Sequence, residues 1–212
     1  MSGVMKQPIL ERKFECLSQN LMTAIPELVS TKQCKAWIEQ YESSAQINRS
    51  QLEDEMLSEC QQILFVNDLD TSLKDYFNGN YMVQWSRFDS VDSSANNHNY
   101  STRWHCDGGV RNTLKLFIYL NSVSEHGGNT LLMDKSRTDK LRDDGHLPIE
   151  GKLRKLMLTE ALLDLCLPTE PIAHNLNAGD GLLFDPAQLA HRCLAPIAEK
   201  IRYTFCYTVF PA

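Results

Sequence analysis

The residues best suited to chemistry begin at His105 and Asp107, which are separated by one position and followed by Gly108 and Gly109. Side chains two positions apart project to the same side of an extended chain, so an imidazole nitrogen and a carboxylate oxygen can meet at one point. His191 lies between strand-like segments and supplies a second imidazole. Two histidines and one carboxylate are ligands of non-haem iron and leave coordination positions open. The sequence therefore predicts that His105, Asp107 and His191 bind iron(II) and form the catalytic centre.

A second feature lies eleven residues after His191, where Arg202 is followed by Thr204 on the same side of a strand. A guanidinium binds a carboxylate through two parallel hydrogen bonds, and a neighbouring hydroxyl adds a third. The sequence thus predicts a metal at one end of a pocket and a carboxylate anchor at the other. A dicarboxylic 2-keto acid fits both ends, because its keto-acid head chelates a metal and its tail reaches Arg202 and Thr204.

These residues must be positioned by the surrounding elements, and the chain up to residue 80 is expected to be helical. Apolar residues recur at helical spacing from Ile9 to Ile25, where Pro26 ends the segment. Ser30 or Thr31 can cap a second helix. Two further helical runs are expected, and they cover 52–63 and 70–77. The four helices are interpreted as a layer that supports a sheet.

The second part of the chain favours strands. They are expected at 81–88, 112–121, 171–176, 182–185 and 201–209. Helices followed by many short strands predict an α+β fold, here a cupin-like double-stranded β-helix, or jelly roll, with the N-terminal helices packed on one sheet. We expect a single domain, 1–212, made of a helical support layer (1–80) and a catalytic core (81–212). An insertion at 134–170 holds a helix at 150–166, which either packs over one sheet or shapes the substrate entrance.

Two predicted strands have two contrasting faces. In 112–121, one face carries only aliphatic residues, and the other carries Thr113, Lys115, Phe117 and Tyr119. The last strand repeats this pattern, with Arg202 and its alternate neighbours on one side and aromatic residues on the other. An ordinary half-exposed strand is one interpretation. Aromatic residues on the polar face favour the other interpretation, in which that face lines a cavity.

Composition bounds the class of protein. The 212 residues carry a net charge of -6 with both signs interspersed, which gives no basic surface for nucleic acid or an anionic membrane. The beginning of the chain has no apolar run typical of a signal peptide, and no later stretch reaches membrane-spanning length. Seven scattered cysteines without a C-x-x-C pair indicate reduced thiols. We therefore expect a cytoplasmic protein that acts on a small molecule or peptide, with its oligomeric state left open.

Substrate contacts are expected near the mouth of the pocket. Gln84, Arg87 and Trp104 are candidates, although Trp104 could equally be a packing residue and Arg87 a surface charge. The Ser/Asn/Asp-rich stretch 89–102 is predicted to be a mobile loop ahead of His105, able to close over a substrate. Its His98 is either solvated or a ligand contact. The remaining histidines, at positions 126, 146 and 174, have no partner at metal-ligand spacing.

With these residues assembled, the sequence resembles the iron(II)- and 2-oxoglutarate-dependent dioxygenases, in particular their prolyl-hydroxylase-like branch. The resemblance covers about 81–212. Its motifs are His105-Cys-Asp107, Tyr119-Leu-Asn121 before Gly127-Gly-Asn-Thr130, Gly179-Asp-Gly-Leu-Leu-Phe-Asp185, His191, and Arg202-Tyr-Thr204. Two departures concern the substrate: Arg202 stands where collagen-type enzymes tend to have Lys, and the insertion is longer than in minimal members.

The resemblance implies hydroxylation of an unactivated C–H bond in an amino acid, a peptidyl side chain or a small metabolite, while 2-oxoglutarate becomes succinate and CO2. Iron(II), 2-oxoglutarate and O2 are implied, with ascorbate as an accessory reductant. It also implies that Tyr119 contacts the distal carboxylate of 2-oxoglutarate, and Lys115 on the same face is a further candidate anchor. Two alternatives stay open. One is a cupin-like metal enzyme that does not use 2-oxoglutarate, and the other is a non-enzymatic jelly-roll binding module.

Overall fold

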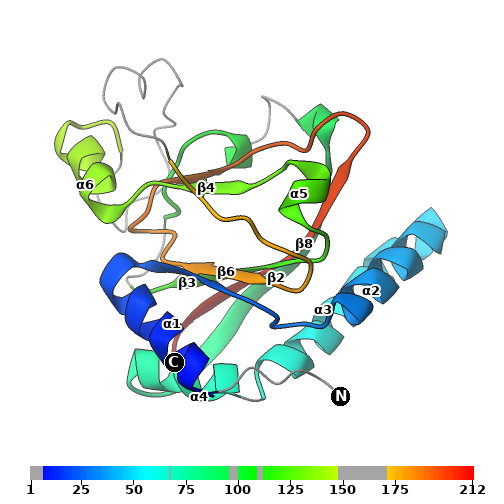
Figure 1. Ribbon diagram of the computed structural model, residues 1–212, viewed down its shortest axis with the longest axis horizontal. Helices are drawn as coiled ribbons and strands as arrows, with labels where there is room; N and C mark the ends of the chain where they lie inside the picture. The colour runs from blue at the N-terminus through cyan, green and yellow to red at the C-terminus, as the bar shows by residue number, and fades with distance from the viewer. Residues whose placement is uncertain (1–6, 67, 96–99, 109–111, 148–170) are drawn as a thin grey trace.

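The computed structural model describes residues 7–66, 68–95, 100–108, 112–147 and 171–212, and it combines helices with two antiparallel sheets (Figure 1). The helices are α1 (Gln7–Asn20), α2 (Thr31–Ser43), α3 (Arg49–Leu64), α4 (Asp68–Phe77), α5 (Val123–His126) and α6 (Lys135–Asp143). The strands are β1 (Met22–Ile25), β2 (Tyr81–Asp92), β3 (Leu114–Tyr119), β4 (Thr130–Leu132), β5 (Ile172–Ala173), β6 (Gly181–Phe184), β7 (His191–Cys193) and β8 (Ile201–Pro211). The predicted α+β class is confirmed.

The larger sheet has the strand order β1-β6-β3-β8-β2, and the smaller has the order β5-β4-β7. Every strand pair is antiparallel. An apolar cluster joins the two sheets, because Leu132 of β4 packs with Phe117 of β3 and Phe184 of β6. A short main-chain bridge also joins His105, which lies outside both sheets, to His191 of β7. The two sheets are therefore held together by an apolar interior between them.

Side chains alternate along the central strands between a face covered by helices and a face that points toward the smaller sheet, and the sequence predicts these two faces. Leu114, Leu116 and Ile118 of β3 join the larger core cluster, whereas Phe117 and Tyr119 belong to the cluster between the sheets. The same division runs along β8. Alternate residues of a strand point to opposite faces, so each central strand serves two separate interiors.

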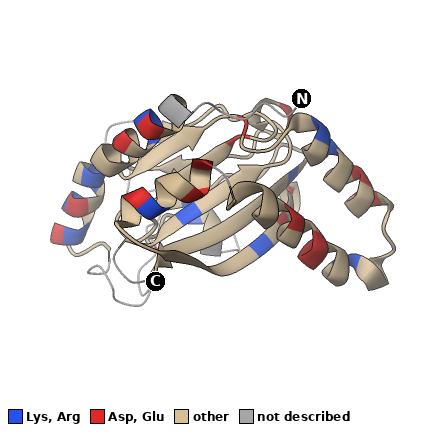
Figure 2. Cartoon of the chain, turned by 90° about the horizontal axis from the view of Figure 1, so that it is seen from below, with Lys and Arg blue, Asp and Glu red and all other residues tan. Residues whose placement is uncertain are grey.

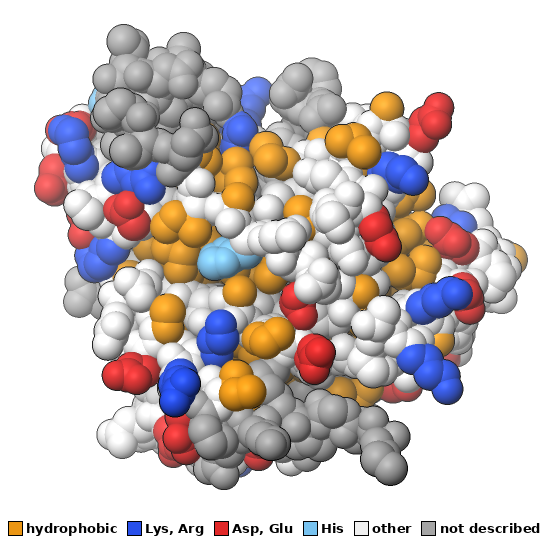
Figure 3. All heavy atoms as spheres, viewed as in Figure 1, with side chains coloured by type: hydrophobic (Ala, Val, Ile, Leu, Met, Phe, Trp, Pro, Cys, Tyr) orange, Lys and Arg blue, Asp and Glu red, His pale blue; other side chains and the backbone are white. Residues whose placement is uncertain are grey.

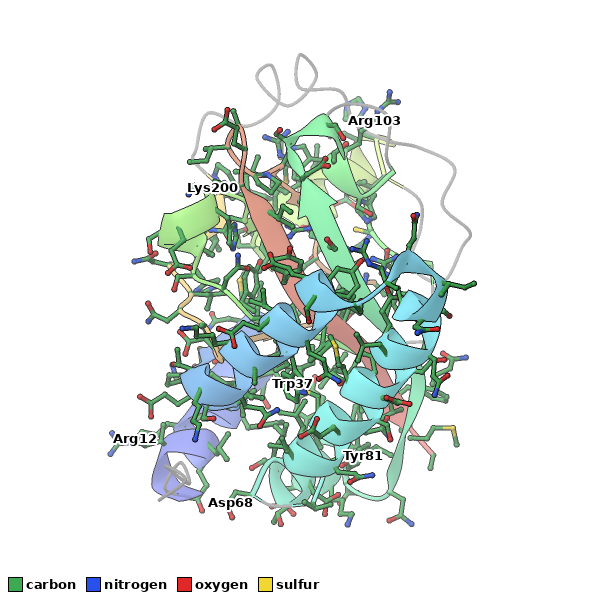
Figure 4. The ribbon with its side chains drawn as sticks, turned by 90° about the vertical axis from the view of Figure 1, so that its right-hand side faces the viewer. Arg12, Trp37, Asp68, Tyr81, Arg103 and Lys200 are labelled. Atoms are coloured by element: carbon green, nitrogen blue, oxygen red, sulfur yellow. The ribbon has the colours of Figure 1, made fainter. Side chains whose placement is uncertain are left out.

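The helices cover the outer face of the larger sheet. Figure 4 shows α2 and α3 crossing in front of its strands, with Trp37 labelled on α2. Trp37 is 1% exposed, its ring centroid lies 5.1 Å from that of Phe205, and its Nε1 donates to Glu59 at 2.8 Å. Ser30 begins α2 as expected, since its hydroxyl accepts a hydrogen bond from the Gln33 amide at 3.2 Å. The helices thus fix the back of the sheet whose front lines the site.

The helix predicted over 9–25 is wrong at its C-terminal end. α1 stops at Asn20, Leu21 adopts a positive φ of 60°, and β1 then pairs with β6, with Met22 opposite Phe184. Helical periodicity describes local preference only, and pairing of Met22 with Phe184, 162 positions later in the chain, overrides it. The helical support layer therefore contributes the edge strand of the larger sheet.

The first long strand also differs from its predicted bounds. β2 continues to Asp92, and its last residues pair with 201–204 of β8. The predicted mobile loop at 89–102 is therefore wrong for 89–92, because cross-strand hydrogen bonds override a composition typical of turns. Ser93–Ala95 and Tyr100–Thr102 form short 3-10 helices. His98 lies outside the described residues.

The insertion is described only in its first part. It contains α6, whose N-cap Asp134 accepts a hydrogen bond from the Arg137 amide at 2.8 Å. The helix predicted at 150–166 lies outside the described residues, and the single-domain assignment stays a prediction.

No helix within the described ranges is long and apolar enough to cross a membrane. Residues of both charge signs are mixed along the helices (Figure 2), and charged side chains of both signs are mixed over the face seen in Figure 3.

Trp37→Ala should destabilise the protein by about 3–5 kcal/mol, because it removes a fully buried aromatic ring and leaves a cavity beside Phe205. Urea denaturation followed by circular dichroism measures the loss. Lys35→Ala is the matched control on the same helix, since the Lys35 side chain is 76% exposed, and it should change stability by less than about 0.5 kcal/mol. Equal stability of the two variants would contradict the packing of α2 on the sheet.

Candidate metal centre and carboxylate anchor

His105, Asp107 and His191 come together although Asp107 and His191 are 84 positions apart in the sequence. The His105 amide donates to the His191 carbonyl at 3.1 Å, and the His191 amide donates to the His105 carbonyl at 2.8 Å. The Asp107 amide donates to the Pro186 carbonyl at 2.7 Å. The main chain therefore sets the relative positions of all three side chains.

The three candidate ligand atoms face one point. Asp107 Oδ1 lies 3.5 Å from His105 Nε2 and 3.8 Å from His191 Nε2. All three atoms lie within 4.8 Å of one another, and both imidazoles are buried. Ligand atoms around a divalent ion with bonds of about 2 Å are separated by such distances.

Backbone carbonyls orient both imidazole rings. His105 Nδ1 lies 2.6 Å from the Arg103 carbonyl oxygen, and His191 Nδ1 lies 3.0 Å from that of Leu189. A carbonyl only accepts, so each Nδ1 carries the proton and each Nε2 presents a lone pair. His191 Nε2 is buried with no hydrogen-bond partner among the described residues. Burial and the neighbouring His105 hold the pKa of His191 well below its usual range, which keeps it in the neutral form that binds metals.

Residues of the insertion and of the 185–188 turn support the ligands, and sequence reasoning missed them. Arg142 of α6 donates to the Ala187 carbonyl and lies 3.4 Å from Cys106 Sγ, so it bridges the segments that carry Asp107 and His191. The Asp185 carboxylate accepts from the amides of Ala187 and Gln188, each at 2.9 Å. Asp185 lies in one of the motifs quoted above, but nothing in the spacing of Arg142 indicates its role.

Arg202 and Thr204 of β8 lie inside the structure with unused polar atoms. They are 5% and 1% exposed, and Arg202 Nε, Arg202 Nη1 and Thr204 Oγ1 have no hydrogen-bond partner among the described residues. A buried donor without a partner costs roughly 1–3 kcal/mol, and more when it is charged. An anion bound at this point would satisfy these donors.

The other two proposed anchors have different surroundings. The Tyr119 hydroxyl is fully buried, lies 2.9 Å from Thr130 Oγ1 and accepts from the Thr130 amide at 3.1 Å. Tyr119 is directly opposite Thr204 in the sheet. Lys115 is opposite Thr208 instead, and its Nζ forms an ion pair with Asp107 Oδ2. The structure therefore places Lys115 at the metal end, four residues along β8 from the anchor.

A cavity of about 550 Å³ reaches from the candidate metal ligands to Arg202, and neither Thr204 nor Tyr119 is among the described residues that line it. Its lining includes the three candidate ligands, Arg202 and Lys115, together with the predicted substrate contacts Gln84 and Arg87. Trp104 is 3% exposed and packs in a separate apolar cluster, with the Arg192 guanidinium 5.4 Å from its ring centroid. The structure thus brings Gln84 and Arg87 to the cavity and assigns Trp104 to packing.

His126 is a further buried residue that sequence reasoning dismissed. Its ring stacks on Tyr119 with centroids 6.3 Å apart, and its Nδ1 accepts from the Gly128 amide at 3.0 Å. Burial, with a smaller contribution from Arg202, lowers the pKa of His126 to about 4. The residue is therefore neutral at pH 7 and adds no charge behind the anchor.

Comparisons with known proteins identify the fold. No protein-family model and no curated protein matches the sequence. Among solved structures, the epimerase SnoN in complex with Fe3+, alpha-ketoglutarate and nogalamycin RO has a TM-score of 0.68 at 11% identity, over 98% of this chain and 85% of SnoN. The alpha-ketoglutarate-dependent carbocyclase SnoK has a TM-score of 0.66 at 14% identity, over 95% of this chain and 84% of SnoK. HygX from Streptomyces hygroscopicus with nickel and 2-oxoglutarate bound has a TM-score of 0.61 at 12% identity, over 95% of this chain and 87% of HygX. The chain shares the fold of these non-haem enzymes.

Stability should fall as the pH is lowered from about 6.5 to about 4, partly because of His126. In this window the unfolded chain protonates this histidine and the folded chain does not, so the unfolded state binds more protons and gains stability at low pH. Urea denaturation of the metal-free protein at several pH values measures the slope. His126→Gln should reduce the slope of unfolding free energy against pH by up to about 1.4 kcal/mol per pH unit, which corresponds to one proton. Equal slopes would contradict the buried neutral state.

Proposed function

We propose that this protein is an iron(II)- and 2-oxoglutarate-dependent oxygenase. One observation carries the proposal: a His-Asp-His cluster and the buried Arg202, whose Nε and Nη1 have no hydrogen-bond partner among the described residues, line one cavity. Thr204, whose hydroxyl is also unsatisfied, lies on the same face of β8 two residues from Arg202. The unpartnered Nε2 of His191 and the carbonyl-bound Nδ1 atoms fit a metal. The unsatisfied Nε and Nη1 of the Arg202 guanidinium fit the tail of a dicarboxylate. A double-stranded β-helix is the fold that we infer from the two sheets and from the structural relatives.

The residues of the chain would divide the work as follows. His105, Asp107 and His191 hold the iron, which, when bound, supplies the oxygen activation that no side chain can supply. Arg202 and Thr204 bind the distal carboxylate of 2-oxoglutarate and orient its keto-acid end toward the ligands. Tyr119 lies in the same row and supports this end of the pocket through Thr130. O2 is the second co-substrate, and ascorbate is proposed as an accessory reductant.

Hydroxylation of an unactivated C–H bond, with succinate and CO2 as co-products, is the proposed outcome. The relatives named above include an epimerase and a carbocyclase, so this fold also serves other outcomes. The proposed substrate is an amino acid, a peptidyl side chain or a small metabolite. We likewise propose that the protein belongs to the prolyl-hydroxylase-like branch and that it is cytoplasmic. Analysis of the product by mass spectrometry distinguishes a gain of one oxygen from isomerisation or loss of two hydrogens.

Two other functions are weaker. A cupin-like metal enzyme without a keto-acid co-substrate has no use for a buried Arg202–Thr204 pair with unsatisfied donors. A non-enzymatic binding module has no use for two imidazoles whose tautomers are both fixed with Nε2 toward Asp107. Both groups cost stability unless a ligand binds them, which favours the oxygenase.

Anaerobic titration of the metal-free protein with iron(II) and then 2-oxoglutarate should produce the weak visible charge-transfer band of a keto acid chelated to ferrous iron. His105→Ala should abolish the band, because it removes a ligand. Binding of iron without the band would favour the cupin-like alternative, and no binding of iron would favour the binding module.

Arg202→Ala should raise the KM for 2-oxoglutarate by at least about 30-fold, because it removes a charged partner at a buried carboxylate site. Asp107→Ala and His191→Ala should instead abolish 2-oxoglutarate turnover at any concentration. Succinate release measures both effects. A KM for Arg202→Ala equal to that of the wild type would refute the anchor.

A further inference from the structure

The charges on the cavity lining do not balance. Among its described residues are three cations, Arg87, Lys115 and Arg202, and two carboxylates, Asp89 and Asp107, which leaves one positive charge. If the proposed function holds, on which this inference rests, iron(II) and the dianion of 2-oxoglutarate cancel each other. The loaded cavity then keeps one positive charge. An unbalanced charge in a partly desolvated cavity favours an anionic partner.

The position of each cation shows which one is available to a substrate. Arg202 is assigned to the tail of 2-oxoglutarate. Lys115 is occupied by Asp107, because its Nζ pairs with Oδ2 while Oδ1 faces the two imidazoles. Arg87 is also paired, with Asp89, but through its Nε alone, which leaves its two Nη groups to face a ligand in the cavity.

Arg87 is held in one orientation by two neighbours on its own strand. Its guanidinium carbon lies 5.0 Å from the Trp85 ring centroid, and its Nε lies 2.6 Å from Asp89 Oδ1. Stacking fixes the plane of the guanidinium, and the Asp89 contact fixes its rotation. The two Nη groups make no hydrogen bond or ion pair with the described residues. They form a pre-oriented fork of the kind that binds a carboxylate through two hydrogen bonds.

Strand register places this fork between the two ends of the cavity. Arg87, Cys206 and Phe117 form one row across β2, β8 and β3. The row of Thr204 lies on one side and the row of Lys115 on the other, each roughly 7 Å away. Since strands are about 4.8 Å apart, β2 and β3 are separated by about 10 Å. A molecule held on Arg87 and reaching toward Asp107 is therefore short.

The edge strand β2 is shaped to receive such a molecule. Its register shifts between Val83 and Trp85, so Gln84 and Trp85, although consecutive, both line the cavity. Bulges of this type re-aim side chains next to active sites. Trp85 is 43% exposed, which leaves an aromatic surface and a fork at the rim of the cavity. The 2-oxoglutarate anchor on β8 is buried instead.

We propose that the substrate is a small carboxylic acid, of the size of an amino acid, whose carboxylate binds the Nη groups of Arg87 while the chain beyond it extends toward the metal centre. Arg87 then determines specificity for the substrate, and Arg202 serves only the co-substrate. Gln84 and the Trp85 ring border the same subsite.

The test uses the iron-loaded enzyme with 2-oxoglutarate and a panel of the twenty amino acids and of carboxylic acids with three to eight carbons, each paired with its primary amide. Succinate release measures turnover. The enzyme should prefer an acid over its amide by at least tenfold in kcat/KM. Arg87→Met should remove that preference, and Arg87→Lys should retain part of it, because lysine keeps the charge and lacks the fork.

Arg49→Met is the matched control, since the Arg49 guanidinium stacks on Tyr41 at 4.8 Å on the helical layer, outside the cavity lining. It should keep the preference for acids. A second measurement needs no turnover: the preferred acid should change the fluorescence of the metal-free protein through Trp85, and this response should be lost in Arg87→Met.

Four results would overturn the proposal: equal use of acids and amides, turnover of amides alone, no acid raising succinate release above the substrate-free rate, or an intact preference in Arg87→Met. The charge-transfer band with 2-oxoglutarate separates the two levels of failure. If the wild type forms the band and the acids are not preferred, only the carboxylate subsite is refuted. If the wild type forms no band, the oxygenase assignment itself fails.

Discussion

The strict alternation of side chains on β3 and β8 is the constraint on which the rest of the structure depends. Each of these central strands packs apolar residues against the helices with one face and lines the site with the other. A shift of register by one residue would move Arg202 and Thr204 to the helices and Tyr203 and Phe205 into the cavity. The apolar face therefore does more than stabilise the sheet. Its burial fixes which side chains face the metal centre.

This arrangement keeps costly groups in place. Arg202 Nε and Nη1, Thr204 Oγ1 and His191 Nε2 are buried without hydrogen-bond partners among the described residues, and each lowers the stability of the ligand-free protein. The fold offsets that cost at sites remote from the chemistry, for example where Trp37 packs on Phe205 and where the Tyr207 hydroxyl donates to the Leu57 carbonyl at 3.0 Å. Unsatisfied polar atoms gathered in and beside one cavity, with a well-packed layer behind them, indicate a site that is completed by ligands.

The sequence predicts much of this site because chemistry and alternation are local properties. The His105–Asp107 spacing, the two faces of 112–121 and the Arg202–Thr204 pair can all be recognised within a few residues. What could not be predicted depends on pairing between distant segments. β1 exists because β6 offers it hydrogen bonds, β2 extends to Asp92 because β8 continues beside it, and Arg142 reaches the ligand segments only through the placement of α6. Lys115 shows the limit of such local reasoning most clearly. Alternation along the strand predicts which face Lys115 is on, but not that it lies beside Asp107 rather than beside Arg202.

The distribution of the site over strands also separates two kinds of recognition. The groups assigned to the co-substrate lie on β8, which is flanked on both sides and whose side chains there are buried. The groups assigned to the substrate lie on β2, which ends the sheet and whose side chains are partly exposed. An edge strand can carry a bulge and change its side chains without loss of a second hydrogen-bonded neighbour, whereas a central strand cannot. Substitutions on β2 can therefore change the substrate while β8 keeps the same co-substrate site. Residues 84–89 are the positions at which such substitutions would act.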